Sequence, residues 1–377
     1  MKLRSGTGWL LVSALALLAG CAAHEPSRRD GPAMTAAEGR ALVGRLLPKG
    51  VADREGWAVD IYAAMAALDV QPRVENICAI FAVAEQETGF RVDPPIPNLA
   101  AIAWKEIERQ RERAGVPKLA LYAALKLPSS DGRSYEERIE AARTELQLSE
   151  VFDDLVGRVP LVKSFLEDRN PVRTGGPMQV SVVYAKAHAA AKPYPYPVID
   201  SLRHEVFSRR GGMYFGIAHL LDYPASYDTF LYRFADFNAG HYASRNAAFQ
   251  KAVSDLSGIP LELDGDLVRF DKGKPAKEPG ATELATRLLA KRIDMSAGEI
   301  RHDLELGGQF AFEKSRLYGR VYEQADRESS RAAPRAMLPQ IALQSSKITR
   351  KLTTDWFAKR VAERHRTCLA RASKFAS

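Results

Sequence analysis

Residues 77–90 read ICAIFAVAEQETGF, an apolar run that ends in polar residues. On a helical wheel the large apolar residues of this run gather in one stripe, and Glu87 falls inside it, between Ile80 and Val83. A carboxylate on the buried face of a helix is costly unless it is paired or protonated, and burial raises the pKa of a carboxylic acid. Because a general acid that works near neutral pH needs such a raised pKa, Glu87 is a candidate catalytic acid. An ion pair with Arg91 at the helix end is the alternative for an isolated Glu.

The composition is that of an ordinary globular protein. The chain has 377 residues, 46% of them hydrophobic and 27% charged, which is enough length for one large core or two modest ones. Its formal net charge of +8 weakly favours anionic surroundings such as a cell wall or a lipid surface. No basic block interleaved with aromatic residues occurs, so we expect no nucleic-acid partner. The sequence has no metal-ligand spacing of His and Cys and no phosphate-binding loop, so we expect no metal and no cofactor.

The first residues resemble a bacterial lipoprotein signal. Lys2 and Arg4 precede an apolar run over residues 9–19, which is too short to span a bilayer comfortably. Residues 18–21 read LAGC and are similar to a lipobox, in which Cys21 is diacylated and becomes the mature N-terminus. An ordinary secretory signal with a coincidental Cys is the alternative.

This resemblance implies a location and an anchor. Residues 1–20 would be a signal peptide and residues 21–34 a polar, lipidated tether. Ala22 follows the Cys, and a residue other than Asp at that position implies sorting to the outer membrane of a Gram-negative bacterium. We therefore expect the protein on the periplasmic face of the outer membrane, held by acyl chains such as palmitate rather than by a transmembrane helix.

Two further Cys follow Cys21 in the sequence, namely Cys78 and Cys368. In an oxidising periplasm they could form a disulfide, which would tie the C-terminal segment to the helix that carries Glu87. Two separate buried thiols are the alternative, because free Cys is among the most buried residue types.

Hydrophobic periodicity predicts a mainly α protein. A capping-box pattern at residues 35–38 marks the start of the fold, and Pro-rich breaks follow at 94–97 and 193–197. The expected helices cover residues 41–47, 56–68, 77–87, 99–113, 119–127, 134–146, 151–168, 214–221, 230–236 and 354–368, with a further helix capped at 296–299.

The C-terminal region, residues 259–377, reads as a helical extension. It contains the best strand signal of the chain, a possible hairpin of residues 261–263 and 267–270 around Asp264-Gly265. Residues 271–282 are rich in Lys, Pro and Gly and read as an exposed loop.

Three further segments carry residues of chemical interest. Residues 174–180 read TGGPMQV, residues 212–220 read GMYFGIAHL and residues 234–240 read FADFNAG. Taken alone, these segments indicate a turn, a core helix and a helix C-terminus. The amides of Gln179 and Asn238 would then satisfy backbone groups of a turn or a cap, which is the commonest role of such residues.

Taken in order with residues 87–90, the segments resemble the soluble lytic transglycosylase family, which shares a lysozyme-like α fold with goose-type lysozymes. The family pattern is Glu-Ser-x-Phe, then Gly-Leu-Met-Gln, then a helix with Gly and Tyr-Leu, then Tyr-Asn-Ala-Gly. The corresponding residues here are Glu87 to Phe90, Gly176 to Gln179, Gly212 or Gly216 with His219-Leu220, and Phe237 to Gly240. The chain also resembles a group of proteobacterial lipoproteins of unknown function.

The family resemblance implies a lysozyme-like domain over residues 35–258, with a helical insertion at about 94–170. It also implies cleavage of the β-1,4 bond between N-acetylmuramic acid and N-acetylglucosamine in peptidoglycan glycan strands. Glu87 would protonate the glycosidic oxygen and then act as base while the muramic acid 6-hydroxyl closes a 1,6-anhydro ring. The implied substrate-binding residues are Thr88, Met178, Gln179 and Asn238.

Departures from the family pattern keep alternatives open. Phe237 replaces the usual Tyr and lacks the hydroxyl that helps to orient the catalytic Glu, whereas Thr88 replaces Ser and keeps a hydroxyl. The tyrosines that could supply the missing contact are Tyr184, Tyr214, Tyr232 and Tyr242. One alternative function is a non-catalytic peptidoglycan-binding or scaffold lipoprotein. Another is a lysozyme-type hydrolase, for which Asp93 or Asp236 is the nearest second carboxylate in sequence.

Overall fold

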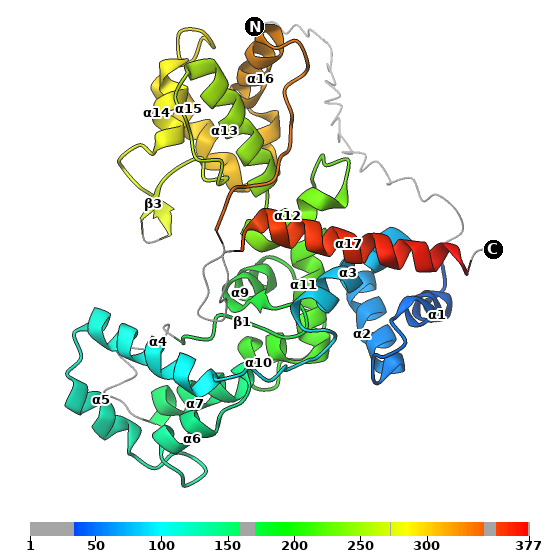
Figure 1. Ribbon diagram of the computed structural model, residues 1–377, viewed down its shortest axis with the longest axis vertical. Helices are drawn as coiled ribbons and strands as arrows, with labels where there is room; N and C mark the ends of the chain where they lie inside the picture. Colours follow the sequence, from blue (N-terminus) through cyan, green and yellow to red (C-terminus); the bar gives the residue numbers. More distant parts are fainter. Residues whose placement is uncertain (1–33, 159–169, 272, 343–351, 376–377) are drawn as a thin grey trace, which may run out of the picture. The chain divides into compact units, whose positions relative to one another are not determined.

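The protein is mainly α-helical, as the periodicity predicted (Figure 1). The computed structural model describes residues 34–158, 170–271, 273–342 and 352–375. The predicted signal peptide, the lipidation site Cys21 and the last part of the helix predicted over 151–168 lie outside these described residues. Within them, no helix has the length and the apolar character that crossing a bilayer requires.

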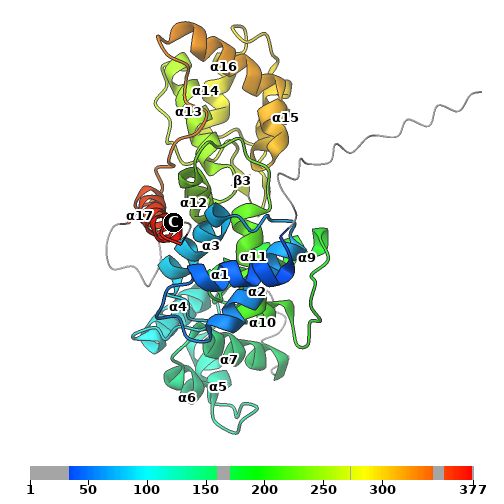
Figure 2. The ribbon, with the colours of Figure 1, turned by 90° about the vertical axis from the view of Figure 1, so that its right-hand side faces the viewer.

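The first core is built around helix α3 (Val74–Glu87), in which every residue from Ile77 to Ala84 is buried. Helices α1, α11 and α17 pack directly on α3, and α1 lies beside α2 (Figures 1 and 2). Because α3 has neighbours on several sides, its whole circumference is buried rather than the single stripe that the sequence predicted. The helices that share this core with α3 are α1 (Ala36–Leu46), α2 (Arg54–Ala67), α9 (Val182–Ala191), α10 (Leu202–Phe207), α11 (Arg209–Leu221), α12 (Phe230–Ala239) and α17 (Thr354–Ser373).

A disulfide fastens α17 to α3. The Sγ atoms of Cys78 and Cys368 are bonded, and both side chains are buried in the first core. His365, also on α17, places its Nε2 atom 3.1 Å from the carbonyl oxygen of Glu75 in the first turn of α3. Of the two possibilities that the sequence left open, the disulfide is therefore the one present.

A second core lies mainly within the segment predicted as an insertion, and Val172 and Phe207 of α10 also belong to it. Its helices are α4 (Leu99–Ala114), α5 (Lys118–Leu125), α6 (Tyr135–Ala141) and α7 (Glu145–Arg158). The side chains of Ser134 and Glu137 form a capping box that starts α6. The single helix predicted over 134–146 is wrong, because Ala142 has an extended backbone and the next carbonyl, that of Arg143, accepts from the N–H of Ile96 at 2.9 Å.

A third core lies in the C-terminal half of the chain. Its helices are α13 (Ala243–Ser257), α14 (Ala281–Leu288), α15 (Ala297–Glu305) and α16 (Arg316–Glu328), with two 3-10 turns at Leu306–Gly308 and Phe310–Lys314. Arg245 of α13 is almost fully buried, and its guanidinium donates to the carbonyl oxygens of Gly307 at 2.5 Å and Gln309 at 2.9 Å. These bonds satisfy a buried cation and fix the turns to α13.

The hairpin predicted between residues 261 and 270 is wrong. Side chains of α13 take the place of a partner strand. The Oε1 atom of Gln250 accepts from the N–H of Gly265 at 2.8 Å, and Nδ2 of Asn246 donates to the carbonyl of Gly265 at 3.1 Å. A short antiparallel pair instead joins β3 (Phe270–Asp271) to β4 (Lys274–Pro275), where the predicted strand ends and the predicted loop begins.

Candidate functional site

Residues 176–179 form the turn of a short β-hairpin. Strand β1 (Thr174–Gly175) pairs antiparallel with β2 (Val180–Ser181). Gly176 has a φ of +72°, a left-handed conformation that glycine adopts without strain. A Cβ atom at this position would also collide with the carbonyl oxygen of Val206. The Gly-Gly-Pro segment is therefore a turn held tightly against the chain that precedes α11.

This hairpin packs on the face of α11 that carries Gly212 and Gly216. Met178 is fully buried, and a Cβ atom on Gly216 would lie 2.5 Å from its sulfur. A Cβ atom on Gly212, one turn earlier, would lie 2.5 Å from Cδ of Pro177. The second and third sequence motifs therefore interlock, because glycine lets the hairpin approach the helix backbone.

Gly212→Ala should destabilise the protein. The new methyl group would lie 2.5 Å from Cδ of Pro177 and 2.8 Å from the carbonyl oxygen of Val206, and neither atom is the end of a flexible side chain. We expect the free energy of unfolding to fall by about 1–3 kcal/mol, measured by urea denaturation. Gly319→Ala on α16 is the matched control, because nothing lies within 4 Å of a Cβ atom there. An equal loss of stability in both variants would contradict the close packing of the hairpin on α11.

The chain directly after Glu87, which is itself half-buried, is fixed by two residues. The hydroxyl of Thr88 donates to the carbonyl oxygen of Pro177 at 2.8 Å and so joins the helix end to the hairpin. Phe90 has a φ of +62° and packs edge to face on Trp57, with ring centroids 5.5 Å apart. The first and second motifs are thus in direct contact, and the hydroxyl that Thr88 shares with the usual Ser makes that contact.

The two predicted amide ligands bond to the protein itself. Gln179 is half-buried in a left-handed conformation, and its Oε1 atom accepts from the hydroxyl of Thr174 at 3.3 Å while its Nε2 lies 3.4 Å from the carbonyl oxygen of Gly176. Asn238 is exposed, and its Oδ1 atom accepts from the hydroxyl of Thr354 at 2.8 Å. Gln179 therefore satisfies its own turn, and Asn238 joins the end of α12 to the start of α17.

Asp236 is a structural carboxylate rather than a second acid in a cleft. It is fully buried, and burial raises its pKa. Its oxygens accept from the hydroxyls of Tyr227 at 2.6 Å and Tyr223 at 3.3 Å, and from the backbone N–H groups of Tyr242 at 2.9 Å and Ser244 at 2.7 Å. These four bonds hold the end of α12 against the start of α13.

The other candidate second carboxylate, and two of the tyrosines that could replace the hydroxyl missing at Phe237, are placed as follows. Asp93 lies beside a helix of the second core, with Oδ1 3.5 Å from the N–H of Leu146 in α7. The hydroxyl of Tyr242 donates to the carbonyl oxygen of Pro224 at 3.0 Å, so that hydroxyl is already in use. Tyr184 belongs to the ring cluster described next, which reaches Phe237.

Tyr184, His219 and His241 form a ring cluster beside Phe237. The ring centroids of Tyr184 and His219 are 4.5 Å apart, those of His219 and His241 are 4.6 Å apart, and those of His219 and Phe237 are 5.0 Å apart. The members come from α9, α11, α12 and the α12–α13 turn, so no local pattern in the sequence signals the cluster. His219 lies on the same face of α11 as Gly212 and Gly216. This spacing is the one signal in the sequence that could have pointed to His219.

Both histidines of the cluster point Nε2 at a carbonyl oxygen. Nε2 of His219 lies 3.1 Å from the carbonyl oxygen of Phe237, and Nε2 of His241 lies 2.8 Å from that of His219. Burial, reinforced by the neighbouring His241, lowers the pKa of His219 to about 3, and burial also lowers the pKa of His241. Both rings are therefore neutral donors at physiological pH, and they hold the third and fourth motifs together.

Acidification should weaken the fold through His219. The unfolded chain binds a proton at this residue below pH 6.5, whereas the folded chain resists protonation down to about pH 3. Stability is therefore lost as the pH falls from 6.5 towards 3, and the loss at pH 4.5 is about 2–3 kcal/mol. His219→Gln keeps a donor for Phe237 and should reduce this loss in urea denaturation at pH 7 and pH 4.5. His302→Gln, on the exposed surface of α15, is the control variant.

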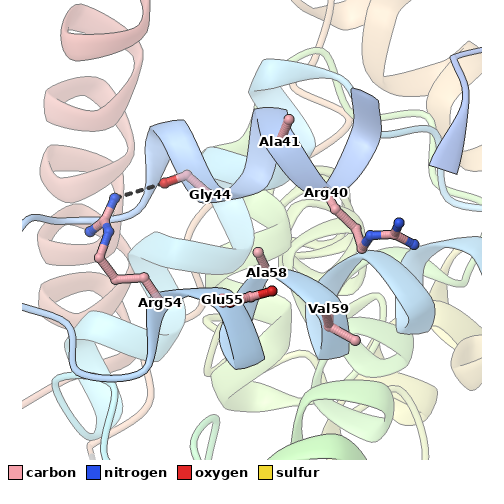
Figure 3. A pocket seen from close by; sticks show the side chains of 7 residues that line it. All are labelled: Arg40, Ala41, Gly44, Arg54, Glu55, Ala58 and Val59. Atoms are coloured by element: carbon pink, nitrogen blue, oxygen red, sulfur yellow. Dashed lines mark hydrogen bonds between the residues drawn. The ribbon is translucent and has the colours of Figure 1, made fainter. Parts of the chain in front are cut away.

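Two surface hollows lie away from these residues. One is lined by Arg40, Ala41 and Gly44 of α1 and by Arg54, Glu55, Ala58 and Val59 of α2 (Figure 3). The guanidinium of Arg54 donates to the carbonyl oxygen of Gly44 at 2.7 Å, which caps the end of α1. The other hollow lies between Met295 and Arg316. Neither hollow is lined by a predicted site residue. In the described part of the chain, no three His, Cys, Asp or Glu are arranged to hold a metal ion.

Comparison with known proteins places the chain in a family. A family model described as a protein of unknown function, DUF1615, matches residues 50–371. The chain belongs to the DUF1615 family. It is also similar to the uncharacterized protein YaiW of Escherichia coli (strain K12), with 50% identity over 362 residues, which are 96% of this chain and 97% of that protein. No solved structure matches the chain. The DUF1615 match spans every predicted site residue from Cys78 to Cys368, and its description names no activity.

Proposed function

We propose that this chain is a lytic transglycosylase that is anchored to the outer membrane and cleaves peptidoglycan glycan strands. The observation that carries the proposal is the 2.8 Å hydrogen bond from Thr88 to the carbonyl oxygen of Pro177, which brings the helix end with Glu87 against the Met178 hairpin. Met178 packs on Gly216, and His219 bonds to the carbonyl oxygen of Phe237. With these contacts, each of the four motifs touches another. Motifs that are far apart in the chain are therefore continuous in the fold.

The proposed reaction needs one carboxylate. Glu87 protonates the oxygen of the glycosidic bond as that bond breaks, and the sugar product leaves with this proton. The carboxylate then accepts the proton of the muramic acid 6-hydroxyl, whose oxygen bonds to C1 and closes the 1,6-anhydro ring. Because the nucleophile comes from the substrate, no second carboxylate is required, unlike in hydrolytic glycosidases. The full occupation of Asp236 by four donors agrees with this one-carboxylate scheme.

The product separates this reaction from hydrolysis. Purified protein incubated with sacculi should release muropeptides with anhydro ends, which mass spectrometry distinguishes from reducing ends that are one water heavier. Release of reducing ends only would point to a lysozyme-type hydrolase. The dependence of release on Glu87 is treated in the Discussion.

A non-catalytic wall-binding role is the second candidate function. It is favoured by Phe237 in place of Tyr, and by the engagement of Gln179 and Asn238 with Gly176 and Thr354. A scaffold of this kind would sediment with sacculi and release no soluble product. Turnover that depends on Glu87 would exclude it.

The proposed anchor is the lipid on Cys21. Cys21→Ser should move the protein from the membrane fraction to the soluble periplasmic fraction, because the mutant hydroxyl is not acylated and acyl chains supply the attachment. Incorporation of a palmitate analogue should be lost in the same variant. A variant that stays with the outer membrane and still carries the label would contradict the assignment.

A further inference from the structure

Two imidazole nitrogens near the ring cluster are buried without a hydrogen-bond partner. The His188 side chain is 8% exposed, its Nε2 atom lies 3.2 Å from Oδ2 of Asp222, and its Nδ1 atom has no partner in the described part of the chain. His219 points Nε2 at the carbonyl oxygen of Phe237, and its Nδ1 atom is likewise buried and unpartnered. In both side chains, therefore, the Nδ1 atom is buried and lacks a hydrogen-bond partner.

These two nitrogens are acceptors. Each Nε2 atom faces an oxygen that only accepts, so Nε2 is the donor of each ring, and in the tautomer with a single ring proton Nδ1 keeps its lone pair. Asp222 is also held by Lys192, whose Nζ lies 2.6 Å from Oδ2, and this bond fixes the carboxylate that orients His188. A buried acceptor without a donor is unfavourable, and native proteins rarely leave one unmatched. A bound group that carries O–H or N–H donors would satisfy both nitrogens.

An aromatic ring joins the two acceptors. The Tyr184 ring lies 5.8 Å from that of His188 and 4.5 Å from that of His219, measured between centroids, and Tyr184 is half-buried. Small-molecule sites commonly combine aromatic surface with a few placed polar groups. A sugar ring supplies the matching chemistry, because it has apolar C–H faces and hydroxyl or amide donors at its edge.

The cluster borders the motif residues. On α11, His219 follows Gly216 by three residues, so the two side-chain positions share the helix face on which Met178 is seated. On α12, Phe237 accepts the bond from His219 and precedes the exposed Asn238. A unit of a glycan strand bound at the ring cluster would therefore lie next to the segment that the proposed function assigns to substrate.

We propose that Tyr184, His188 and His219 form a subsite for one N-acetylated sugar unit, in which the two Nδ1 atoms accept hydrogen bonds from the hydroxyl or amide groups of the sugar. This inference rests on the proposed function for the class of sugar. It assigns substrate contacts to Tyr184 and His188, which lie outside the four motifs. It also assigns one to His219, which stands where the family pattern has Tyr. For a sugar to bind, the half-buried Tyr184 ring must shift enough to let a hydrogen-bond donor reach each Nδ1 atom.

The test is binding of chitotetraose to the full-length protein, measured by calorimetry. His188→Gln and His219→Gln each keep the donor to Asp222 or Phe237 and remove the Nδ1 acceptor, so each should raise the Kd by roughly fivefold to tenfold. His302→Gln should leave the Kd unchanged. In ¹⁵N spectra of the unsubstituted protein, the Nδ1 resonances of His188 and His219 should shift during the titration.

The outcomes separate this inference from the proposed function. An unchanged Kd in both Gln variants, no Nδ1 shift, or no binding of the sugar would overturn the subsite and leave ordered water as the partner of the two nitrogens. Glu87-dependent release from sacculi would still uphold the proposed function in that case. Conversely, binding that depends on His188 and His219 in a protein without turnover would uphold the subsite and remove the catalytic role.

Discussion

Glu87→Gln should lower the release of anhydro-muropeptides from sacculi by a factor of about 10²–10⁴, the usual contribution of a positioned general acid–base group. The amide keeps the size of the side chain but can neither donate a proton to the glycosidic oxygen nor accept one from the 6-hydroxyl. Because the backbone around it is fixed by Thr88 and Phe90, the substitution should leave the fold in place. Circular dichroism and the urea midpoint of the variant should therefore match those of the unsubstituted protein.

Glu85→Gln is the matched control for this experiment. Glu85 lies on the same last turn of α3 but is exposed, and its Oε1 atom lies 3.8 Å from Nε of Arg364 on α17. An exposed ion pair of this kind contributes at most about 1 kcal/mol, so the control should keep both activity and stability. Unchanged release by Glu87→Gln, or an equal loss in the two variants, would remove Glu87 from the reaction.

The helices that the sequence predicted have local signals, whereas α9, α10 and α13 were not predicted. The 3.6-residue periodicity and the caps at Ser134 and Ser296 lie within each segment, and both capping boxes are present. The burial of α3 was predicted incompletely, because periodicity reports which residues are apolar and not how many neighbours a helix has. One of its neighbours is α17, which reaches α3 from the opposite end of the sequence and covers the side that the wheel left open.

The failed hairpin illustrates a different limit. Leu263, Leu267 and Val268 are apolar residues of the two predicted strands, and all three are buried. However, the backbone polar groups between them are satisfied by Gln250 and Asn246 of α13 rather than by a second strand. A side chain that substitutes for a ladder partner leaves no trace in a two-residue pattern, so the strand signal was misleading.

The site was predictable only as far as its motifs reach. The order of the four segments indicated Glu87, Thr88 and Met178, and the structure brings the Thr88 and Met178 segments into contact. The ring cluster and the bond from Thr354 to Asn238 join helices that are far apart in the chain, and such pairings depend on tertiary packing. The spacing of Gly212 and Gly216 was the missed clue, since bare positions one turn apart indicate a close backbone approach.

Removal of the disulfide should lower the free energy of unfolding by about 2–5 kcal/mol. Cys78 and Cys368 are separated by 290 residues, so the bond restricts nearly the whole unfolded chain, and the loss of chain entropy in that state grows with the length of the closed loop. Urea denaturation with and without a reductant should show the difference as a lower midpoint in the reduced protein.

The double variant Cys78→Ala/Cys368→Ala separates the bond from other effects of the reductant. Ala is suitable because both positions are buried and a Ser hydroxyl would bring an unsatisfied polar group into the core. This variant should match the reduced protein and should no longer respond to the reductant. Full stability in the double variant would mean that α17 is held by packing alone, through contacts such as that of His365 with Glu75. Because α17 covers α3, freeing its end would also weaken the cover over the helix that carries Glu87.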